Sequence, residues 1–221
     1  MLLVFSVAFV ASHFVLSSHP VRSRLVARLG LGGFLGFYSL VSFATLIPMA
    51  LAYDGPQNLL YTPPAWGRHA NHVLSLLAFV FLVGGVSSPS PTAVGGKVDE
   101  RAPRAFVTVS RHTGLWGFGL WALGHLLVRG DQDSITLFVA IATLAFGGML
   151  HIDARRRRRD PESWDRFAAQ TSLLPFGAAI AGRVRVDWRG VLPRALIGLA
   201  LGLVVAYAHG WIIGVSAGLG P

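Results

Sequence analysis

Long stretches without a charged residue constrain this chain more than any other feature. A helix that crosses the hydrocarbon core of a bilayer needs about 20 mainly apolar residues. Only 13% of the 221 residues are charged, against about a quarter in ordinary proteins, and the charges gather in short patches. The sequence therefore predicts an all-α fold, a polytopic membrane helix bundle with about six transmembrane helices, and argues against an ordinary soluble enzyme. The predicted spans are Leu2–Ser17, Gly32–Tyr53, Ala70–Val86, Phe106–Val128, Ser134–Ile152 and Val191–Val215.

The lysines and arginines predict how these spans are oriented. Of the 19 cationic residues, 17 fall in the first, third and fifth links between spans or within the first six residues of the span that follows such a link. The positive-inside rule makes that side cytoplasmic. We therefore expect a single domain, residues 1–221, in the bacterial inner membrane, with both termini outside and a cytoplasmic link at about residues 153–190. This topology explains the net charge of +9. We therefore expect the lipid bilayer as a partner and no nucleic acid.

Two features stand out in the fifth link. Residues Pro161–Gln170 are typical of a short amphipathic helix, with Trp164, Phe167 and Ala168 on one face. The preceding run Arg155–Arg159 either fixes the topology as a stop-transfer cluster or binds anionic lipid headgroups.

Histidine is the residue type that brings chemistry into the predicted spans. No carboxylate occupies the middle of a span and the chain has no cysteine. Imidazole remains, and it suits haem iron, copper, zinc or non-haem iron. Predicted depths follow from the topology and the helical rise of 1.5 Å per residue. The predicted cytoplasmic layer holds His13, His19, His112 and His151, and the outer layer holds His69, His72, His125 and His209. Alternatively, each ring hydrogen-bonds a main-chain carbonyl.

The fourth span combines histidines with glycines. His112 and His125 are separated by about 140° around a helix, so both cannot face one small site. Small residues beside His125 allow a neighbouring helix or a flat ligand to approach closely, and both interpretations stay open. These residues are the stripe Gly114, Phe118 and Trp121 with the flanking Gly117 and Gly124. A similar pattern, Gly198 to Gly202, lies in the last span.

Three blocks of the sequence resemble the NnrU family. They are HFVLSSHPVRSRLVARLG near the N-terminus, RHTGLWGFGLWALGHLLVRGD in the fourth span, and DARRRRRD followed by WDRFAAQTSLLPF in the fifth link. The resemblance covers nearly the whole chain. It implies a bacterial membrane protein associated with denitrification, in the handling of nitrite and nitric oxide.

The same domain resembles plant 15-cis-zeta-carotene isomerase, a membrane haem b protein. This resemblance implies a haem b cofactor, and it places the ligands at His13 and His125. The predicted depths add His112 as a further candidate. Ala122 replaces a cysteine proposed there as an alternative ligand, and Thr113 replaces a usual proline. The predicted depths put His13 inside and His125 outside, which conflicts with this pair. His13 with His112, or His125 with His72 or His209, would share a level.

The leading hypothesis is therefore a haem b protein that acts on nitrogen oxides or isomerises a hydrophobic polyene. Whether the chain is an enzyme stays open. A second resemblance, to isoprenylcysteine and phospholipid methyltransferases, implies an S-adenosylmethionine pocket. It would use Arg111, His112, Asp160, Glu162 and Arg166. A third hypothesis is a non-enzymatic assembly factor for a reductase partner.

Overall fold

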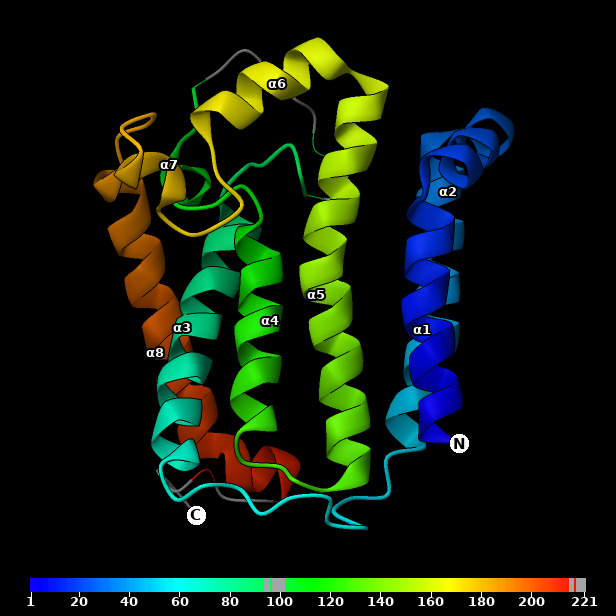
Figure 1. Ribbon diagram of the computed structural model, residues 1–221, viewed down its shortest axis with the longest axis vertical. Coiled ribbons are helices and arrows are strands. Elements are labelled where there is room, and N and C mark those ends of the chain that lie inside the picture. The colour runs from blue at the N-terminus through cyan, green and yellow to red at the C-terminus, as the bar shows by residue number, and fades with distance from the viewer. Residues whose placement is uncertain (94–95, 97–101, 215–216, 218–221) are drawn as a thin grey trace. The chain divides into compact units, whose positions relative to one another are not determined.

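The described part of the chain is built from helices alone, which confirms the all-α prediction (Figure 1). The computed structural model describes residues 1–93, 96, 102–214 and 217. Lys97 and Arg101 of the third link, and the predicted end of the last span at Val215, lie outside these residues. The elements are α1 Leu2–Ser17, α2 His19–Leu51, α3 Gly67–Ser87, a 3-10 helix η1 Ala105–Thr108, α4 Thr113–Leu126, α5 Gln132–Arg159, α6 Pro161–Gln170, α7 Gly177–Ile180 and α8 Trp188–Ile213.

Within the described residues, four helices are long and apolar enough to cross a membrane: α2, α3, α5 and α8. Helix α1 has 16 residues and α4 has 14. At 1.5 Å per residue these two helices are about 21 to 24 Å long, which is shorter than a hydrocarbon core of about 30 Å. Four spans are therefore supported by length, and the count of about six stays a prediction.

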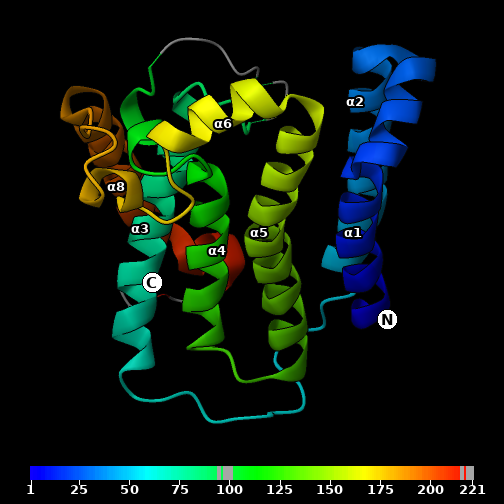
Figure 2. The same ribbon diagram turned by 45° about the horizontal axis from the view of Figure 1, so that its top comes forward.

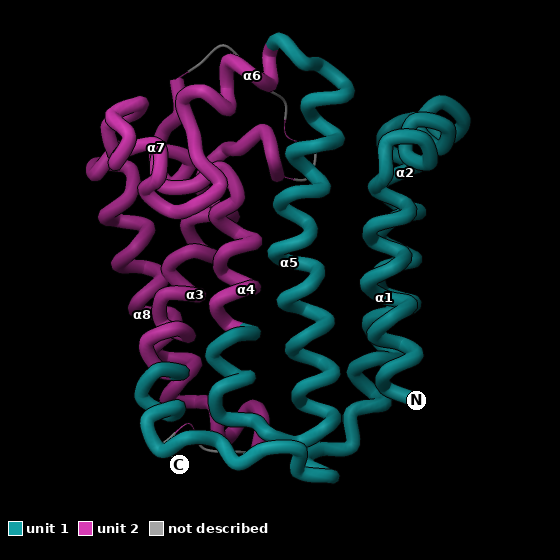
Figure 3. Tube along the Cα trace, viewed as in Figure 1, with its two compact units in different colours: residues 1–71, 122–162 teal, residues 72–121, 163–221 magenta. Residues whose placement is uncertain are grey.

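The chain divides into two compact units, coloured separately in Figure 3. Unit 1 comprises residues 1–71 and 122–162, and unit 2 comprises residues 72–121 and 163–221. Unit 1 holds α1, α2 and α5, and unit 2 holds most of α3, α4 and α6 together with α7 and α8. The single domain expected over residues 1–221 stays a prediction.

The core of unit 1 forms where α1 packs against α2 and α5. Leu2, Phe9 and Met49 are its buried residues. A kink at Gly30, with a φ of 69°, divides α2. This left-handed conformation is one that glycine adopts without steric cost. The kink separates a basic segment, residues 19–29, from the apolar remainder of α2. It therefore lies close to the predicted boundary between the first link and the span that starts at Gly32.

A polar cluster ties the other end of unit 1 together. The Arg129 guanidinium donates to Tyr53 Oη at 2.9 Å and to Ser134 Oγ at 3.2 Å. It also forms an ion pair with Asp131 at 3.4 Å. Asp131 in turn caps α5 by accepting a hydrogen bond from the Ser134 backbone N at 2.8 Å. The start of α5 is thereby fixed to the end of α2.

Glycines allow the helices of unit 2 to approach closely. Figure 2 shows α3 and α4 side by side. A Cβ on Gly117 of α4 would lie 2.6 Å from Leu82 Cγ and 2.9 Å from the Ala78 carbonyl oxygen of α3. A Cβ on Gly198 of α8 would lie 2.6 Å from Val80 Cα. At these two glycines the small side chains therefore serve helix packing.

The predicted fourth span, Phe106–Val128, is not one continuous helix. Residue Phe106 lies in η1, and α4 begins only at Thr113. Between them Ser110 Oγ donates to the Leu173 carbonyl, and Thr113 Oγ1 donates to the Ser110 carbonyl, both at 2.8 Å. Hydroxyl groups that bond to the backbone in this way compete with the helical hydrogen bonds. The apolar pattern alone did not reveal this interruption.

The amphipathic helix predicted at Pro161–Gln170 is confirmed as α6 with the same bounds. Trp164 and Phe167 form a buried cluster with Val107, and Ala168 packs against it. The three residues of the predicted apolar face are therefore the ones that attach α6 to η1 in unit 2.

Candidate functional site

His13 is held between α1 and α2 through both of its ring nitrogens. Nδ1 lies 2.7 Å from the Phe9 carbonyl oxygen, and Nε2 lies 3.3 Å from Ser42 Oγ. The ring meets Tyr38 edge-on, with centroids 5.3 Å apart. These contacts fix the imidazole of the first predicted haem ligand in a polar setting.

His125, the second predicted ligand, lies in the last turn of α4, where its ring stacks on Phe138 of α5 at 4.7 Å. The Phe14 ring, next to His13 in sequence, faces Gly147 of α5. Nine residues separate Phe138 from Gly147, a rise of about 13 Å along α5. The structure thus places His13 and His125 in the same unit but at different levels. Their pairing on one iron, which needs a common level, stays a prediction.

The third candidate, His112, belongs to unit 2 and is 2% exposed. Its carbonyl oxygen accepts the Trp116 backbone N–H at 3.0 Å. The neighbouring Arg111 guanidinium lies over the Trp164 ring, 5.7 Å from the centroid. The role of Arg111 and His112 in an S-adenosylmethionine pocket stays a prediction.

Two histidines that were not paired from the sequence share a cavity in unit 1. His19, at the start of α2, and His151, on α5, line a space of about 310 Å³. The Phe14 ring meets His151 edge-on at 5.4 Å. Among the described residues, His151 Nε2 is buried without a hydrogen-bond partner. The sequence carried one signal for this site, because His151 and Arg155 are four residues apart and so share a helix face.

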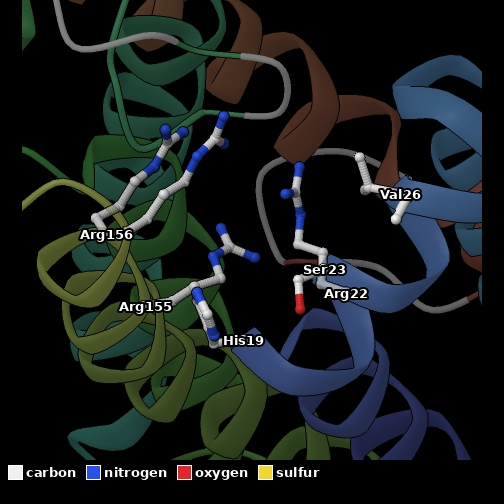
Figure 4. Close-up of a pocket in the computed structure, with 8 residues that line it drawn as sticks. His19, Arg22, Ser23, Val26, Arg155 and Arg156 are labelled. Atoms are coloured by element: carbon white, nitrogen blue, oxygen red, sulfur yellow. The ribbon is translucent and has the colours of Figure 1, made fainter.

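A second cavity of about 320 Å³ adjoins His19 and is lined mainly by cations. Arg22 comes from α2 and Arg155 from α5, and Figure 4 shows the two guanidinium groups reaching into the same space. The full lining is His19, Arg22, Ser23, Val26, Ala27, Arg155, Arg156 and Arg159. No carboxylate is among these described lining residues.

Contacts with neighbouring groups fix two of these arginines. The Arg22 guanidinium lies 5.0 Å from the centroid of the Phe34 ring, a cation–π contact, and Phe34 itself is buried. Arg155 Nη1 donates to the Ser17 carbonyl oxygen at 3.2 Å. We call the residues that line the two cavities the His–Arg site of unit 1.

The His–Arg site combines two kinds of binding group. A neutral imidazole ligates transition metals, and guanidinium groups bind carboxylates and phosphates. Within the described residues no three histidine, cysteine or acidic side chains gather as a metal site. A haem does not require such a group, because the porphyrin occupies the equatorial positions and protein side chains supply only axial ligands.

Comparison with known proteins identifies one family. The sequence model described as NnrU protein matches residues 1–217, nearly the whole chain. No curated protein and no solved structure matches the chain.

Proposed function

The chain belongs to the NnrU family, and from this premise we propose that it binds haem b through histidine side chains. Its apolar helices fit a membrane protein. In our proposal it is a multi-pass protein of the bacterial inner membrane with both termini outside. It acts on nitrogen oxides, or it isomerises a double bond of a hydrophobic polyene.

The observation that carries this proposal is the buried Nε2 of His151. A buried polar atom without a partner costs free energy, and such atoms are rare in native structures. A haem iron would give this nitrogen a partner. The neighbouring Arg155 and Arg158 would donate hydrogen bonds to the two carboxylates of the haem. The chemistry of these side chains therefore suits the iron and the carboxylates of a haem. The family resemblance adds His13 and His125 to the candidate ligands.

A bound haem would supply redox or Lewis-acid chemistry at its iron. Histidines of unit 1 would hold the iron, and the arginines beside His151 would bind the carboxylates. The Nδ1 contact with the Phe9 carbonyl orients the His13 ring, and Nε2 would have to give up its contact with Ser42 Oγ to bind the iron.

The visible spectrum of the purified protein tests the proposal. The full chain is expressed with a haem precursor, purified in mild detergent and scanned for a Soret band. His13→Ala, His125→Ala and His151→Ala are compared singly with His69→Ala, because His69 is an exposed histidine of the same unit. We expect a Soret band in the wild type and in the His69 variant, and loss of most of it in at least one of the other three. Absence of the band from the wild type, after haem has been added, would overturn the proposal.

The two activities are separated by adding ligands to the haem-loaded protein. Nitric oxide that shifts the Soret band at stoichiometric concentration supports the nitrogen-oxide role. Conversion of a 15-cis polyene, followed by chromatography of the extracted lipid, supports isomerisation. Neither response in a protein that retains its haem would contradict both activities and leave haem binding standing.

A further inference from the structure

We propose that the arginine-lined cavity between the start of α2 and the end of α5 binds a phosphate group. The proposal concerns a second ligand and does not require haem, although His19 and Arg155 line both cavities. The cavity lies wholly within unit 1 and measures about 320 Å³, which is ample for a phosphate and the first atoms of the group that carries it.

The charge of the lining demands an anion. Four of the eight lining residues are arginines, a fifth is His19, and none is acidic. Arginine stays protonated at all physiological pH values, so these like charges repel one another across a partly enclosed space. An anion bound among them would remove that repulsion and add charge-assisted hydrogen bonds.

The placement of the arginines favours phosphate over a single carboxylate. A carboxylate is planar and is satisfied by one bidentate guanidinium. Here Arg22 approaches from α2, whereas Arg155 and Arg156 approach from α5 (Figure 4). Arg159 of α5 also lines the cavity. Donors on two opposite walls match the tetrahedrally arranged oxygens of a phosphate. The Phe34 and Ser17 contacts hold Arg22 and Arg155 in place.

The start of α2 reinforces the cavity. Ser18 is the N-cap of this helix, and Pro20 lies in its first turn. Unpaired backbone N–H groups and the helix dipole make such an end favourable for anions. Ser18 and Pro20 line the adjoining cavity, whereas His19 and Arg155 line both, so the helix start lies beside the arginine-lined cavity.

Two sources could supply the phosphate: the headgroup of an anionic lipid, or a soluble phosphorylated molecule. Both present the same chemistry to the arginines. Exposed Leu29 ends the basic segment of α2 and exposed Leu31 follows it, so a headgroup in the cavity would leave its acyl chains beside apolar side chains. The experiment therefore has one arm for each source.

The test measures thermal unfolding of the full chain in a zwitterionic detergent, followed by tryptophan fluorescence. One arm titrates sodium phosphate against sodium chloride at equal ionic strength. The other titrates short-chain phosphatidylglycerol against phosphatidylcholine. The cavity variant is Arg22→Gln with Arg155→Gln. Its matched control is Arg24→Gln with Arg157→Gln, which removes the same charge from the same two helices outside the cavity lining.

We expect phosphate, phosphatidylglycerol or both to raise the unfolding temperature of the wild type. The apparent affinity should fall at least tenfold in the cavity variant and less than twofold in the control. Stabilisation by phosphatidylglycerol alone assigns the ligand to lipid, and stabilisation by phosphate assigns it to a soluble molecule. Equal losses of affinity in the cavity variant and the control would overturn the proposal. So would a wild type that is stabilised equally by phosphate and chloride and equally by the two lipids.

A lysine variant covers the case in which the glutamine pair does not fold. Arg22→Lys with Arg155→Lys keeps the charge but loses the planar fork that binds two oxygens at once. We expect this variant to bind several-fold more weakly than the wild type. Unchanged affinity would contradict the geometry argued above.

Discussion

The Asp187 carboxylate joins two segments of unit 2 that are far apart in sequence. Its Oδ2 accepts the backbone N–H of Ala105 at 2.8 Å, and its Oδ1 accepts that of Gly190 at 3.1 Å. Ala105 has a φ of 46°, a left-handed conformation that is uncommon for a residue with a side chain. One carboxylate thus caps α8 and holds the strained start of η1.

These hydrogen bonds predict an acid-sensitive contribution to stability. The hydrogen bond from the Ala105 N–H lowers the pKa of Asp187 most, and the bond from the Gly190 N–H lowers it further. Burial raises this pKa by a smaller amount. A carboxyl whose pKa is lowered on folding stabilises the protein above its unfolded value of about 3.9. This stabilisation is lost as the pH falls below that value and through the lowered pKa. We expect Asp187→Asn to lower the unfolding temperature at pH 7, and its deficit to shrink between pH 5 and pH 3. A deficit independent of pH would contradict the assignment.

Removing the Asp187 side chain altogether should cost more. An N-cap replaced by alanine typically loses about 0.5–2 kcal/mol, and here the bond to Ala105 is lost as well. We expect Asp187→Ala to unfold below Asp187→Asn in temperature scans at pH 7. Asp133→Ala is the control, because Asp133 lies in the first turn of another helix, α5, in unit 1. Equal stability of the alanine and asparagine variants would show that the carboxylate geometry is unimportant.

The close contact of α8 with α3 predicts a steric effect. A Cβ at Gly198 would lie 2.6 Å from Val80 Cα and 2.8 Å from the Phe79 carbonyl oxygen, both backbone atoms that cannot move aside independently. Overpacking of this kind costs about 1–3 kcal/mol. We expect Gly198→Ala to be destabilised accordingly. Gly36→Ala, with nothing within 4 Å of its Cβ, should match or exceed the wild type because alanine favours helix.

The buried face of α6 predicts a large loss on truncation. Trp164 is 2% exposed and packs with Phe167 and Val107. Deleting a buried tryptophan side chain costs about 3–5 kcal/mol. We expect Trp164→Ala to detach α6, seen as faster proteolysis within residues 161–170. Trp66→Ala removes a 60% exposed tryptophan and should leave the proteolysis pattern unchanged; equal cleavage of both variants would argue against the packing.

The absence of cysteine makes the predicted topology directly testable. A cysteine placed at Gln57, an exposed residue of the second link, should react with a membrane-impermeant maleimide in intact cells. One placed at Glu162, exposed in the fifth link, should react only after lysis. The reverse pattern would place the termini inside and contradict the orientation deduced from the arginines.

Local patterns in the sequence predicted several elements accurately. The spacing of Trp164 and Phe167 was sufficient for α6 because an amphipathic period is a property of a few consecutive residues. Counting residues along the helices also predicted a separation of His13 from His125, and the contacts of Phe14 and His125 lie at different levels of α5. The depths of the two histidines in a membrane stay a prediction. In both cases the information is local or follows from the order of the spans.

Contacts between distant segments could not be predicted in the same way. The meeting of His19 with His151 depends on how α2 leaves α1 and on the rotation of α5, neither of which the apolar pattern specifies. The interruption before Thr113 arises from the hydroxyl of Ser110 bonding to Leu173, far along the chain. The apolar period of residues 106–128 is compatible with a continuous helix, so only tertiary contacts reveal the break.

The φ torsion of Gly30, at the kink in α2, determines the direction of the segment that carries Arg22. The basic start of α2 changes direction at this residue before the apolar part begins. A residue with a side chain at position 30 would disfavour the left-handed φ and favour a straight helix. A straight helix would move Arg22 away from the arginines of α5. If the cavity binds phosphate as proposed, its affinity would depend on a glycine outside the cavity lining, and a substitution there would change binding without altering a charge.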